Sequence, residues 1–392
     1  MFKHSEIYRR GKNDDKVSGI VKTIEYTINF FFLNKVANIV TNATQLSLLA
    51  WTVLELIYFI MNPSKQFLMD YGYSFFAIFY VFMIMAVHHV QKGERDEMES
   101  FINENFWNLK CCGSEFYENL AVQARRAKLF AWLQFSLALI SGLLFWPHES
   151  DRLDLFFVLM FLDKHYKSFY QYYKYAFFSL LSWGTLIVLT YVNIYIFFIA
   201  QLNFQYQLLT KHVEDIEMGF ENDNSSDQYH EEIRMRLNIC ASHFQRLTKF
   251  RFLFSKFVYW TFFFVVWVGL GVSMFLAYHL IVMQNYENVI ALSFLWFMVA
   301  EITVTVAVLS QHYIDLSENF FRTLTKCDWY HWSKSNKKTF LLFMMYSQKY
   351  IFITVGGVLI FDISIMVWMA QRTISALTFL QAVRRKNNMQ QM

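Results

Sequence analysis

Proline is almost absent from this 392-residue chain, and charged residues are scarce. Pro63 and Pro147 are the only prolines, and both lie at the ends of apolar runs. This distribution favours long, uninterrupted helices, because proline breaks a helix interior. Charged residues make up 17% of the chain, whereas soluble domains carry about 25%. The alternative of a soluble all-helical protein is therefore disfavoured.

The chain also lacks the motifs of enzymes and cofactor proteins. Its four cysteines form no CxxC pair, since Cys111 and Cys112 are adjacent while Cys240 and Cys327 stand alone. No histidine lies at ligand spacing from them, so we expect no metal site and no cofactor. No nucleotide-binding loop or His/Cys/Asp constellation occurs, which predicts that the protein is not an enzyme. Basic residues are dispersed over the connecting segments, which argues against a nucleic-acid partner.

What the chain has in abundance is apolar sequence, at 56% of all residues, with 20% aromatic. Seven runs approach or exceed the roughly 18 apolar residues that cross a bilayer. The polar N-terminus lacks a signal-peptide core, so we expect the first span to direct insertion. The sequence predicts an all-α membrane protein with seven transmembrane helices: Val36–Met61, Met69–Val90, Leu129–Trp146, Tyr175–Leu202, Phe257–Met283, Val289–Ser310 and Tyr350–Val383.

The distribution of Lys and Arg predicts the orientation of these spans. Most basic residues of the connecting segments fall on the side that holds the N-terminus and the segments after spans two, four and six. The positive-inside rule then places the N-terminus in the cytoplasm and the C-terminus outside the cell. All four cysteines fall on the cytoplasmic side, where thiols stay reduced. This topology is the reverse of that of G-protein-coupled receptors, so we expect no G-protein partner.

Two cytoplasmic segments continue the helical pattern beyond the spans. Apolar residues recur at helical spacing between charges from Glu214 to Phe254 and again after span six. Amphipathic helices of this length need a packing partner. Two interpretations remain open here: the helices pack against one another, or they form an oligomerisation platform.

Three motifs in the last quarter of the chain resemble those of the insect odorant receptors. Ser317-Glu318 precedes the aromatic cluster Asp328-Trp329-Tyr330, and Met344–Lys349 resembles the signature ahead of helix seven. Thr354-Val355-Gly356-Gly357 is followed by a helix that ends in Ser375-Ala376-Leu377-Thr378. Chain length and loop lengths match along the whole chain. Tyr350 stands where the family usually has proline, and Ala376-Leu377 replaces a common Tyr-Phe pair.

The resemblance implies a ligand-gated, non-selective cation channel in the plasma membrane of the olfactory neuron dendrite. Such a tuning subunit forms a heterotetramer with an odorant co-receptor. Residues 1–310 would hold spans one to six, the ligand pocket and the cytoplasmic helix extensions. Residues 311–349 would form the cytoplasmic anchor segment, and 350–392 the pore-lining part of a split helix seven with a short extracellular tail. The resemblance assigns subunit anchoring to Trp329, Tyr330, Ser347, Gln348 and Lys349.

The outer halves of spans two to six are rich in aromatic residues with a few hydroxyls among them. Such walls suit a small neutral volatile, whose binding derives mainly from buried apolar area at about 25 cal/mol per Å². Phenylalanine that faces lipid or fills helix contacts is the alternative for each position. The candidate ligand-binding residues are Phe76, Phe79, Tyr80, Leu139, Gly142, Trp146, Phe178, Ser182, Thr185, Phe275 and Tyr278.

The last span carries a stripe of small, hydroxylated and charged residues, as a helix bordering water requires. Helical spacing puts most of the candidate pore residues on one face. Phe379 would form a hydrophobic constriction that closes by dewetting. Glu301 and Asp362 also lie within spans, where a charge is costly, so either a structural or a functional role is open for them. The candidate pore residues are Arg372, Ser375, Thr378, Phe379 and Ala382.

Two rival functions remain. A gustatory-type channel would work without a co-receptor, but the C-terminal signature of that family is missing here. A secondary transporter would show internal repeats and broken helices, and Gly356-Gly357 is the only clear interruption inside a predicted span.

The predicted orientation can be tested with epitope tags. We expect a tag after Met392 to bind antibody in intact cells, and a tag before Met1 to bind only after permeabilisation, because Lys and Arg retain the N-terminal side in the cytoplasm. Immunofluorescence with and without detergent measures both. A C-terminal tag that is reached only after permeabilisation would contradict the orientation.

Overall fold

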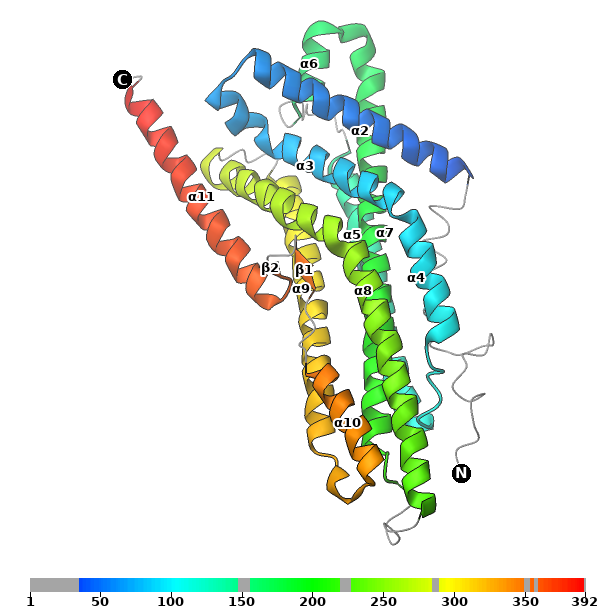
Figure 1. Cartoon of the computed structure of the whole chain (residues 1–392). Helices are drawn as coiled ribbons and strands as arrows, with labels where there is room; N and C mark the ends of the chain where they lie inside the picture. The colour runs from blue at the N-terminus through cyan, green and yellow to red at the C-terminus, as the bar shows by residue number, and fades with distance from the viewer. Residues whose placement is uncertain are drawn as a thin grey trace.

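The computed structural model describes residues 35–146, 156–218, 227–283, 289–348, 353–355 and 359–390. In these residues the chain is almost entirely helical, with one short strand pair near its end (Figure 1). The elements in chain order are α2 Lys35–Met61, α3 Lys65–Val90, α4 Lys92–Asn105, α5 Ser114–Leu144, α6 Phe157–His165, α7 Lys167–Glu214, α8 Asp227–Tyr278, η2 His279–Met283, α9 Val289–Thr325, η3 Trp329–His331, α10 Lys334–Ser347, β1 Thr354–Val355, β2 Leu359–Ile360 and α11 Ile363–Gln390.

Seven of the described helices are long and apolar enough to cross a membrane: α2, α3, α5, α7, α8, α9 and α11. The prediction of an all-α protein with seven spans is therefore confirmed. Local signals set several helix ends. The hydroxyl of Ser64 accepts from the Phe67 N–H before the second turn of α3, and Ser333 does the same for Asn336 in α10.

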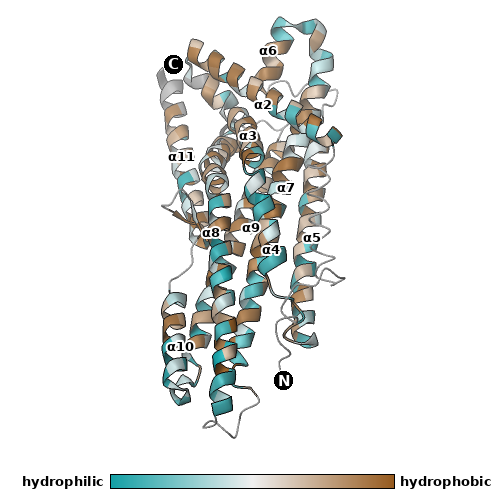
Figure 2. Cartoon of the chain, turned by 45° about the vertical axis from the view of Figure 1, so that its right-hand side comes forward, coloured by the Kyte–Doolittle hydropathy of each residue, from teal (hydrophilic) through white to brown (hydrophobic). Residues whose placement is uncertain are grey.

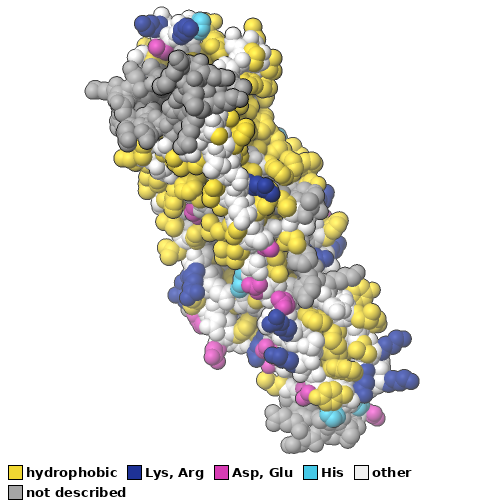
Figure 3. All heavy atoms as spheres, turned by 90° about the vertical axis from the view of Figure 1, so that its left-hand side faces the viewer, with side chains coloured by type: hydrophobic (Ala, Val, Ile, Leu, Met, Phe, Trp, Pro, Cys, Tyr) yellow, Lys and Arg dark blue, Asp and Glu magenta, His cyan; other side chains and the backbone are white. Residues whose placement is uncertain are grey.

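Helices α7 and α8 extend well beyond a bilayer. Their 48 and 52 residues correspond to about 72 and 78 Å at 1.5 Å per residue, against a hydrocarbon core of about 30 Å. Their lower ends meet the lower end of α9 and helix α10, and we call this assembly the polar bundle (Figure 1). Hydrophilic residues concentrate there (Figure 2), and charged side chains gather toward the same end on the face drawn in Figure 3.

The polar bundle has an aromatic core of its own. The rings of Phe244 in α8, Phe320 in α9 and Phe343 in α10 lie 5.4 to 5.8 Å apart, centroid to centroid. The amphipathic helices expected from the sequence therefore pack against one another.

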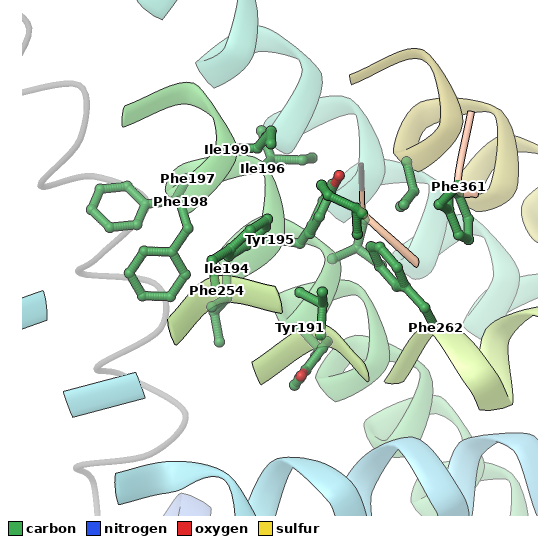
Figure 4. Close-up of a cluster of buried hydrophobic side chains, with 14 of the residues drawn as sticks. Tyr191, Ile194, Tyr195, Ile196, Phe197, Phe198, Ile199, Phe254, Phe262 and Phe361 are labelled. Carbon is green, nitrogen blue, oxygen red and sulfur yellow. The ribbon is translucent and has the colours of Figure 1, made fainter. Parts of the chain in front are cut away.

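Helix α7 forms the centre of the molecule, and its apolar stretch is 83% buried. Two tyrosines on this helix, both labelled in Figure 4, form hydrogen bonds with neighbouring parts of the bundle. The Tyr191 hydroxyl donates to Gln91 Oε1 at 2.7 Å and lies 2.6 Å from Thr261 Oγ1. Gln91 Nε2 in turn donates to the carbonyl of Phe257 at 2.6 Å. The Tyr195 hydroxyl lies 2.7 Å from Ser310 Oγ of α9.

The seventh span begins later than the predicted Tyr350–Val383. Strands β1 and β2 pair antiparallel, with Thr354 opposite Ile360 and Val355 opposite Leu359, and α11 begins only at Ile363. Residues 350–352 lie outside the described residues. The β-branched residues in these strands favour extended backbone, and the strand pair separates α10 from α11. The upstream boundary of the predicted span was thus wrong, while the expected split of helix seven is confirmed.

Phe361 holds the start of α11 against the bundle. Its N–H donates to the carbonyl of Ile353 at 2.8 Å. Its side chain is fully buried, and its ring centroid lies 4.4 Å from that of Phe262 in α8 (Figure 4). From this point α11 packs on α8 and α9 and leans away from the other helices toward its C-terminal end (Figure 1).

The network around Gln91 should contribute measurably to stability. We expect Gln91→Leu to lower the free energy of unfolding by about 1–3 kcal/mol, because it leaves the buried Tyr191 hydroxyl and Phe257 carbonyl with fewer partners. Thermal unfolding of the purified protein in detergent measures the change. Gln228→Leu, at an exposed position of α8, is the matched control. Equal unfolding temperatures for the two variants would contradict the assignment.

Candidate functional site

A cavity lies among α3, α5, α7, α8 and α9, in the half of the molecule away from the polar bundle. Its free volume is about 90 Å³, several times the roughly 10–15 Å³ that one water molecule needs. Its walls are almost wholly apolar. The lining residues are Ala77, Tyr80, Val81, Ser141, Gly142, Phe145, Phe156, Phe178, Leu181, Ser182, Thr185, Val188, Leu189, Gly269, Val272, Leu295, Met298, Val299 and Ile302.

Three hydroxyl groups of the lining have unused hydrogen-bonding capacity. Within the described residues, the side chains of Tyr80, Ser141 and Ser182 form no hydrogen bond, whereas Thr185 donates to the carbonyl of Leu181 at 3.0 Å. Tyr80 and Ser141 are buried. A ligand in the cavity can hydrogen-bond to hydroxyl groups that no protein group engages. The cavity therefore suits a small apolar molecule with one or two polar atoms.

Two glycines shape the cavity. A Cβ on Gly142 would lie 3.2 Å from Ser182 Oγ, so this position leaves room only for the serine. A Cβ on Gly269 would meet nothing within 4 Å and would project into open space. The wall that α8 contributes is therefore recessed at Gly269, and a larger side chain there would occupy part of the cavity.

The structure brings five of the predicted ligand-binding residues to the cavity wall: Tyr80, Gly142, Phe178, Ser182 and Thr185. Two others, Leu139 and Trp146, lie on the outer surface with exposures of 60% and 40%. The Trp146 ring lies 6.1 Å from that of Tyr175.

The four remaining candidates form helix contacts beside the cavity. Phe76 and Phe275 stack with their centroids 5.4 Å apart. Each ring lies against a glycine of the other helix: Phe275 is 2.7 Å from a Cβ placed on Gly72, and Phe76 is 2.8 Å from one on Gly271. This pair interlocks α3 with α8.

Phe79 stacks on Phe75 at 6.0 Å between ring centroids. The Tyr278 hydroxyl donates to Met69 Sδ at 3.4 Å. Both residues therefore contact protein side chains other than those that line the cavity.

Sequence reasoning missed most of the aliphatic lining. The predicted residues were mostly aromatic, whereas α9 contributes Leu295, Met298, Val299 and Ile302 to the wall. The spacing of these four at three to four residues marks one helical face. That spacing was a usable signal, although nothing in it distinguishes a cavity wall from a helix contact.

Helix α11 presents two different faces. Ile365 and Met369 are buried against the bundle, and the Trp368 ring lies 5.9 Å from that of Trp267 in α8. The Arg372 guanidinium lies over the Trp368 ring at 5.7 Å. All five predicted pore residues lie at exposed positions: Arg372, Ser375, Thr378, Phe379 and Ala382. Nothing among the described residues of this chain covers that face, and Phe379 is 67% exposed.

The predicted anchor residues lie around α10 in the polar bundle. Trp329 of η3 packs on Phe340 with ring centroids 6.1 Å apart. The Tyr330 hydroxyl donates to Asp328 Oδ1, which raises the pKa of the tyrosine. Ser347 is buried and donates to the carbonyl of Met344. Gln348 caps α10, because its N–H also donates to that carbonyl, and Lys349 lies outside the described residues.

A groove of about 690 Å³ runs between α8 and α10 beside these residues. The adjoining face of α10 is apolar, and no described residue covers it. Its exposed side chains are Leu341, Leu342, Met345 and Tyr346.

Charged residues inside the spans serve helix packing. Glu301 Oε1 accepts from Gln134 Nε2 of α5 at 3.2 Å and from Thr305 at 3.1 Å. Glu55 of α2, which the sequence analysis did not single out, is 1% exposed and accepts from Ser74 of α3 at 3.1 Å. These contacts give both carboxyl groups a structural role within the bundle.

The family model of the seven-transmembrane odorant receptors, described as "7tm Odorant receptor", matches residues 65–372. This chain belongs to the odorant receptor family. It is accordingly a multi-pass membrane receptor and not an enzyme. A search of curated proteins finds no match.

The fold of this receptor is similar to that of the insect olfactory receptor OR5 from Machilis hrabei, with a TM-score of 0.70 and 11% sequence identity. The match covers 94% of this chain and 100% of that chain. The structure of OR5 in complex with eugenol matches over the same shares, with a TM-score of 0.65 and 11% identity. At this identity the similarity establishes the fold.

The recess at Gly269 provides a test of the cavity as the odorant site. We expect Gly269→Leu to raise the half-maximal odorant concentration by about tenfold or more, equivalent to 1.4 kcal/mol, because the leucine would occupy the cavity. Concentration–response curves of odorant-evoked current measure the shift. Gly93→Leu is the matched control, since a Cβ on Gly93 also meets nothing within 4 Å but the residue is exposed on α4. Equal responses of both variants would contradict the assignment.

Proposed function

We propose that this odorant receptor is a subunit of an odorant-gated, non-selective cation channel in the plasma membrane. A small neutral volatile occupies the cavity among α3, α5, α7, α8 and α9, and the pore is bordered by α11. One observation carries the proposal: α8 and α9, which supply part of the cavity wall, are also the helices on which α11 packs.

The chemistry of the cavity supports a volatile ligand. Its walls are apolar, and Tyr80, Ser141 and Ser182 supply hydroxyls that form no other hydrogen bond within the described residues. A molecule with an apolar body and a single carbonyl, ether or hydroxyl group satisfies both features. The eugenol complex of a similar receptor is consistent with a small-molecule site in this fold.

Two contacts connect the cavity to α11. Gly269 and Val272 of α8 line the cavity, and Trp267 of the same helix meets Trp368 of α11. About one and a half turns before Trp267, Phe262 packs on Phe361 at the start of α11. A ligand that displaces α8 or α9 therefore shifts the support of α11, and we propose that this movement carries the outer end of α11 away from the pore axis.

The exposed face of α11 supports a position beside water. Arg372, Ser375, Phe379 and Ala382 follow each other at three to four residues, so they share one helical face. Several copies of α11 around a common axis would bring the Phe379 rings together as a hydrophobic constriction. The hydroxyls of Ser375 and Thr378 would then border the aqueous path.

The uncovered apolar face of α10 supports assembly of several subunits. Leu341, Leu342, Met345 and Tyr346 are exposed beside the groove between α8 and α10. Apolar patches of this kind mark protein contacts. We propose that this region, with the predicted anchor residues, joins the receptor to an odorant co-receptor in a heterotetramer whose N-termini lie in the cytoplasm.

Co-expression tests the proposed function. We expect volatile-evoked cation currents in cells that express this receptor together with an odorant co-receptor. Cells that express the co-receptor without this receptor are the control, and their currents should not show the same odorant selectivity. Full responses without any co-receptor would favour the gustatory-type mode of action. Surface-expressed receptor that gives no current to any volatile of a broad panel would contradict the proposal.

The constriction at Phe379 can be tested separately. We expect Phe379→Ala to raise the resting current in the absence of odorant, because loss of the rings widens and wets the pore. Whole-cell recording, normalised to surface expression, measures this current. The matched control is Phe169→Ala, since Phe169 of α7 is similarly exposed but distant in sequence from α11. If the resting current and the odorant-evoked current of Phe379→Ala are unchanged, Phe379 does not form the gate.

A further inference from the structure

The segment between α4 and α5 lies against the C-terminal end of α7 in the polar bundle and carries two adjacent cysteines. Cys111 Sγ lies 3.5 Å from Nε2 of His212, a residue 101 positions later in the chain. The possible ligand atoms of Cys111, Cys112 and His212 all lie within 4.8 Å of one another. The sequence analysis expected no metal site, because no histidine is near these cysteines along the chain.

Hydrogen bonds hold the cysteine segment in place. The Trp107 N–H donates to Gln205 Oε1, and Gln205 Nε2 donates back to the Trp107 carbonyl, each at 3.0 Å. Gln205 lies on α7, two turns before His212, and is buried. The Cys111 N–H donates to the Asn108 carbonyl at 3.1 Å. The segment is therefore fixed to the helix that carries the histidine.

The end of the segment has a conformation that suits glycine. Gly113 has a φ of 94° and its N–H donates to the Lys110 carbonyl at 3.3 Å. This turn closes directly after Cys112, so that both thiols remain on the side of α7.

The distance between the Cys111 thiol and the His212 imidazole fits a tetrahedral zinc ion. Zn–S bonds are about 2.3 Å and Zn–N bonds about 2.0–2.1 Å, which places tetrahedral sulfur and nitrogen ligands about 3.6 Å apart. The 3.5 Å between Cys111 Sγ and His212 Nε2 agrees with that separation. Two thiolates and one imidazole are also the ligand types that zinc prefers.

We propose that Cys111, Cys112 and His212 form a binding site for Zn²⁺ or a similarly thiophilic divalent cation. On binding, each thiol releases one proton to solvent, the neutral imidazole supplies the third ligand, and a water molecule completes the tetrahedron. The carboxylate of Asp215, three residues beyond His212, forms an ion pair with Lys211 Nζ at 3.0 Å.

The ion would join the segment between α4 and α5 to α7. All three side chains are partly exposed, so an ion reaches the site from the aqueous phase. Trp107 links the site to α8, since its ring lies 4.8 Å from that of His212 and stacks at 3.8 Å on that of His243. Bound metal would thus fix a connecting segment to α7 and α8, the two longest described helices.

Metal titration of the purified full-length receptor tests the proposal. The protein is stripped with a chelator under a phosphine reductant, transferred to metal-free detergent buffer and titrated with Co²⁺. We expect one ion per chain with the thiolate-to-cobalt absorption of a tetrahedral site, and displacement of the cobalt by Zn²⁺.

Variants locate the ligands. We expect Cys111→Ser, Cys112→Ser and His212→Gln each to weaken binding by more than about 100-fold, since loss of even an outer-shell partner costs 10–100-fold. Cys327→Ser is the matched control, because this half-buried thiol also belongs to the polar bundle but not to the cluster. It should bind the ion like the unmodified receptor. Equal binding by all four variants would overturn the proposal.

A second measurement needs no variant and therefore does not depend on whether a variant folds. Zn²⁺ should slow the alkylation of Cys111 and Cys112 by N-ethylmaleimide, as read by mass spectrometry of peptides. The rate at Cys327 should not change. Burial raises the pKa of Cys327 to about 12, so its slow reaction is followed over a longer time.

Two results would overturn the proposal. The first is that Zn²⁺ leaves the alkylation rates of Cys111 and Cys112 unchanged. The second is that the folded receptor is isolated with Cys111 and Cys112 joined as a disulfide and, once this bond is reduced, still binds no added metal. Neither measurement involves an odorant, so their outcome is independent of the proposed channel function.

Discussion

The packing of Phe361 on Phe262 fixes the start of α11 against the rest of the receptor. Beyond this point α11 packs on α8 and α9 through its own inner face. Phe361 is fully buried, and its N–H donates a hydrogen bond to the carbonyl of Ile353. The start of α11 is therefore fixed while its far end projects from the bundle (Figure 1). A helix that is held at one end and projects at the other can move without unfolding, which the gating role proposed for α11 requires.

The rest of the bundle is held together by few polar contacts among many apolar ones. Gln91 and Tyr191 join α3, α7 and α8, and Glu301 joins α5 to α9. Between membrane helices such bonds contribute about 0.6–2 kcal/mol each. Their larger effect is on register, because a shifted helix would leave the same groups unpaired in an apolar surrounding. Packing fixes the register in the same way where Phe76 and Phe275 lie against glycines of the opposite helix.

Helices α7, α8 and α9 extend from the cavity to the polar bundle without a break within the described residues. A change at the cavity can therefore be transmitted along rigid elements to the bundle where subunits are proposed to meet. Continuous helices also disfavour the transporter alternative, which requires interrupted helices around a central site. The short strand pair before α11 is the one described interruption, and it lies at the attachment of α11 and not at the cavity.

The sequence by itself determined the seven spans and the motifs of the family, because hydropathy and motif spacing are local properties that are read along the chain. Of the residues that it predicted to bind the ligand, Tyr80, Gly142 and Ser182 line the cavity, since the polarity of the spans puts these helix ends on one side. Only the tertiary structure decided which face of each helix borders the cavity, and hence that aliphatic residues of α9 form one wall. Only the tertiary structure, likewise, brings His212 to Cys111 across 101 residues of chain. The physical reason is the same in both cases: contacts between helices depend on rotation and register, which are fixed by packing partners distant in sequence.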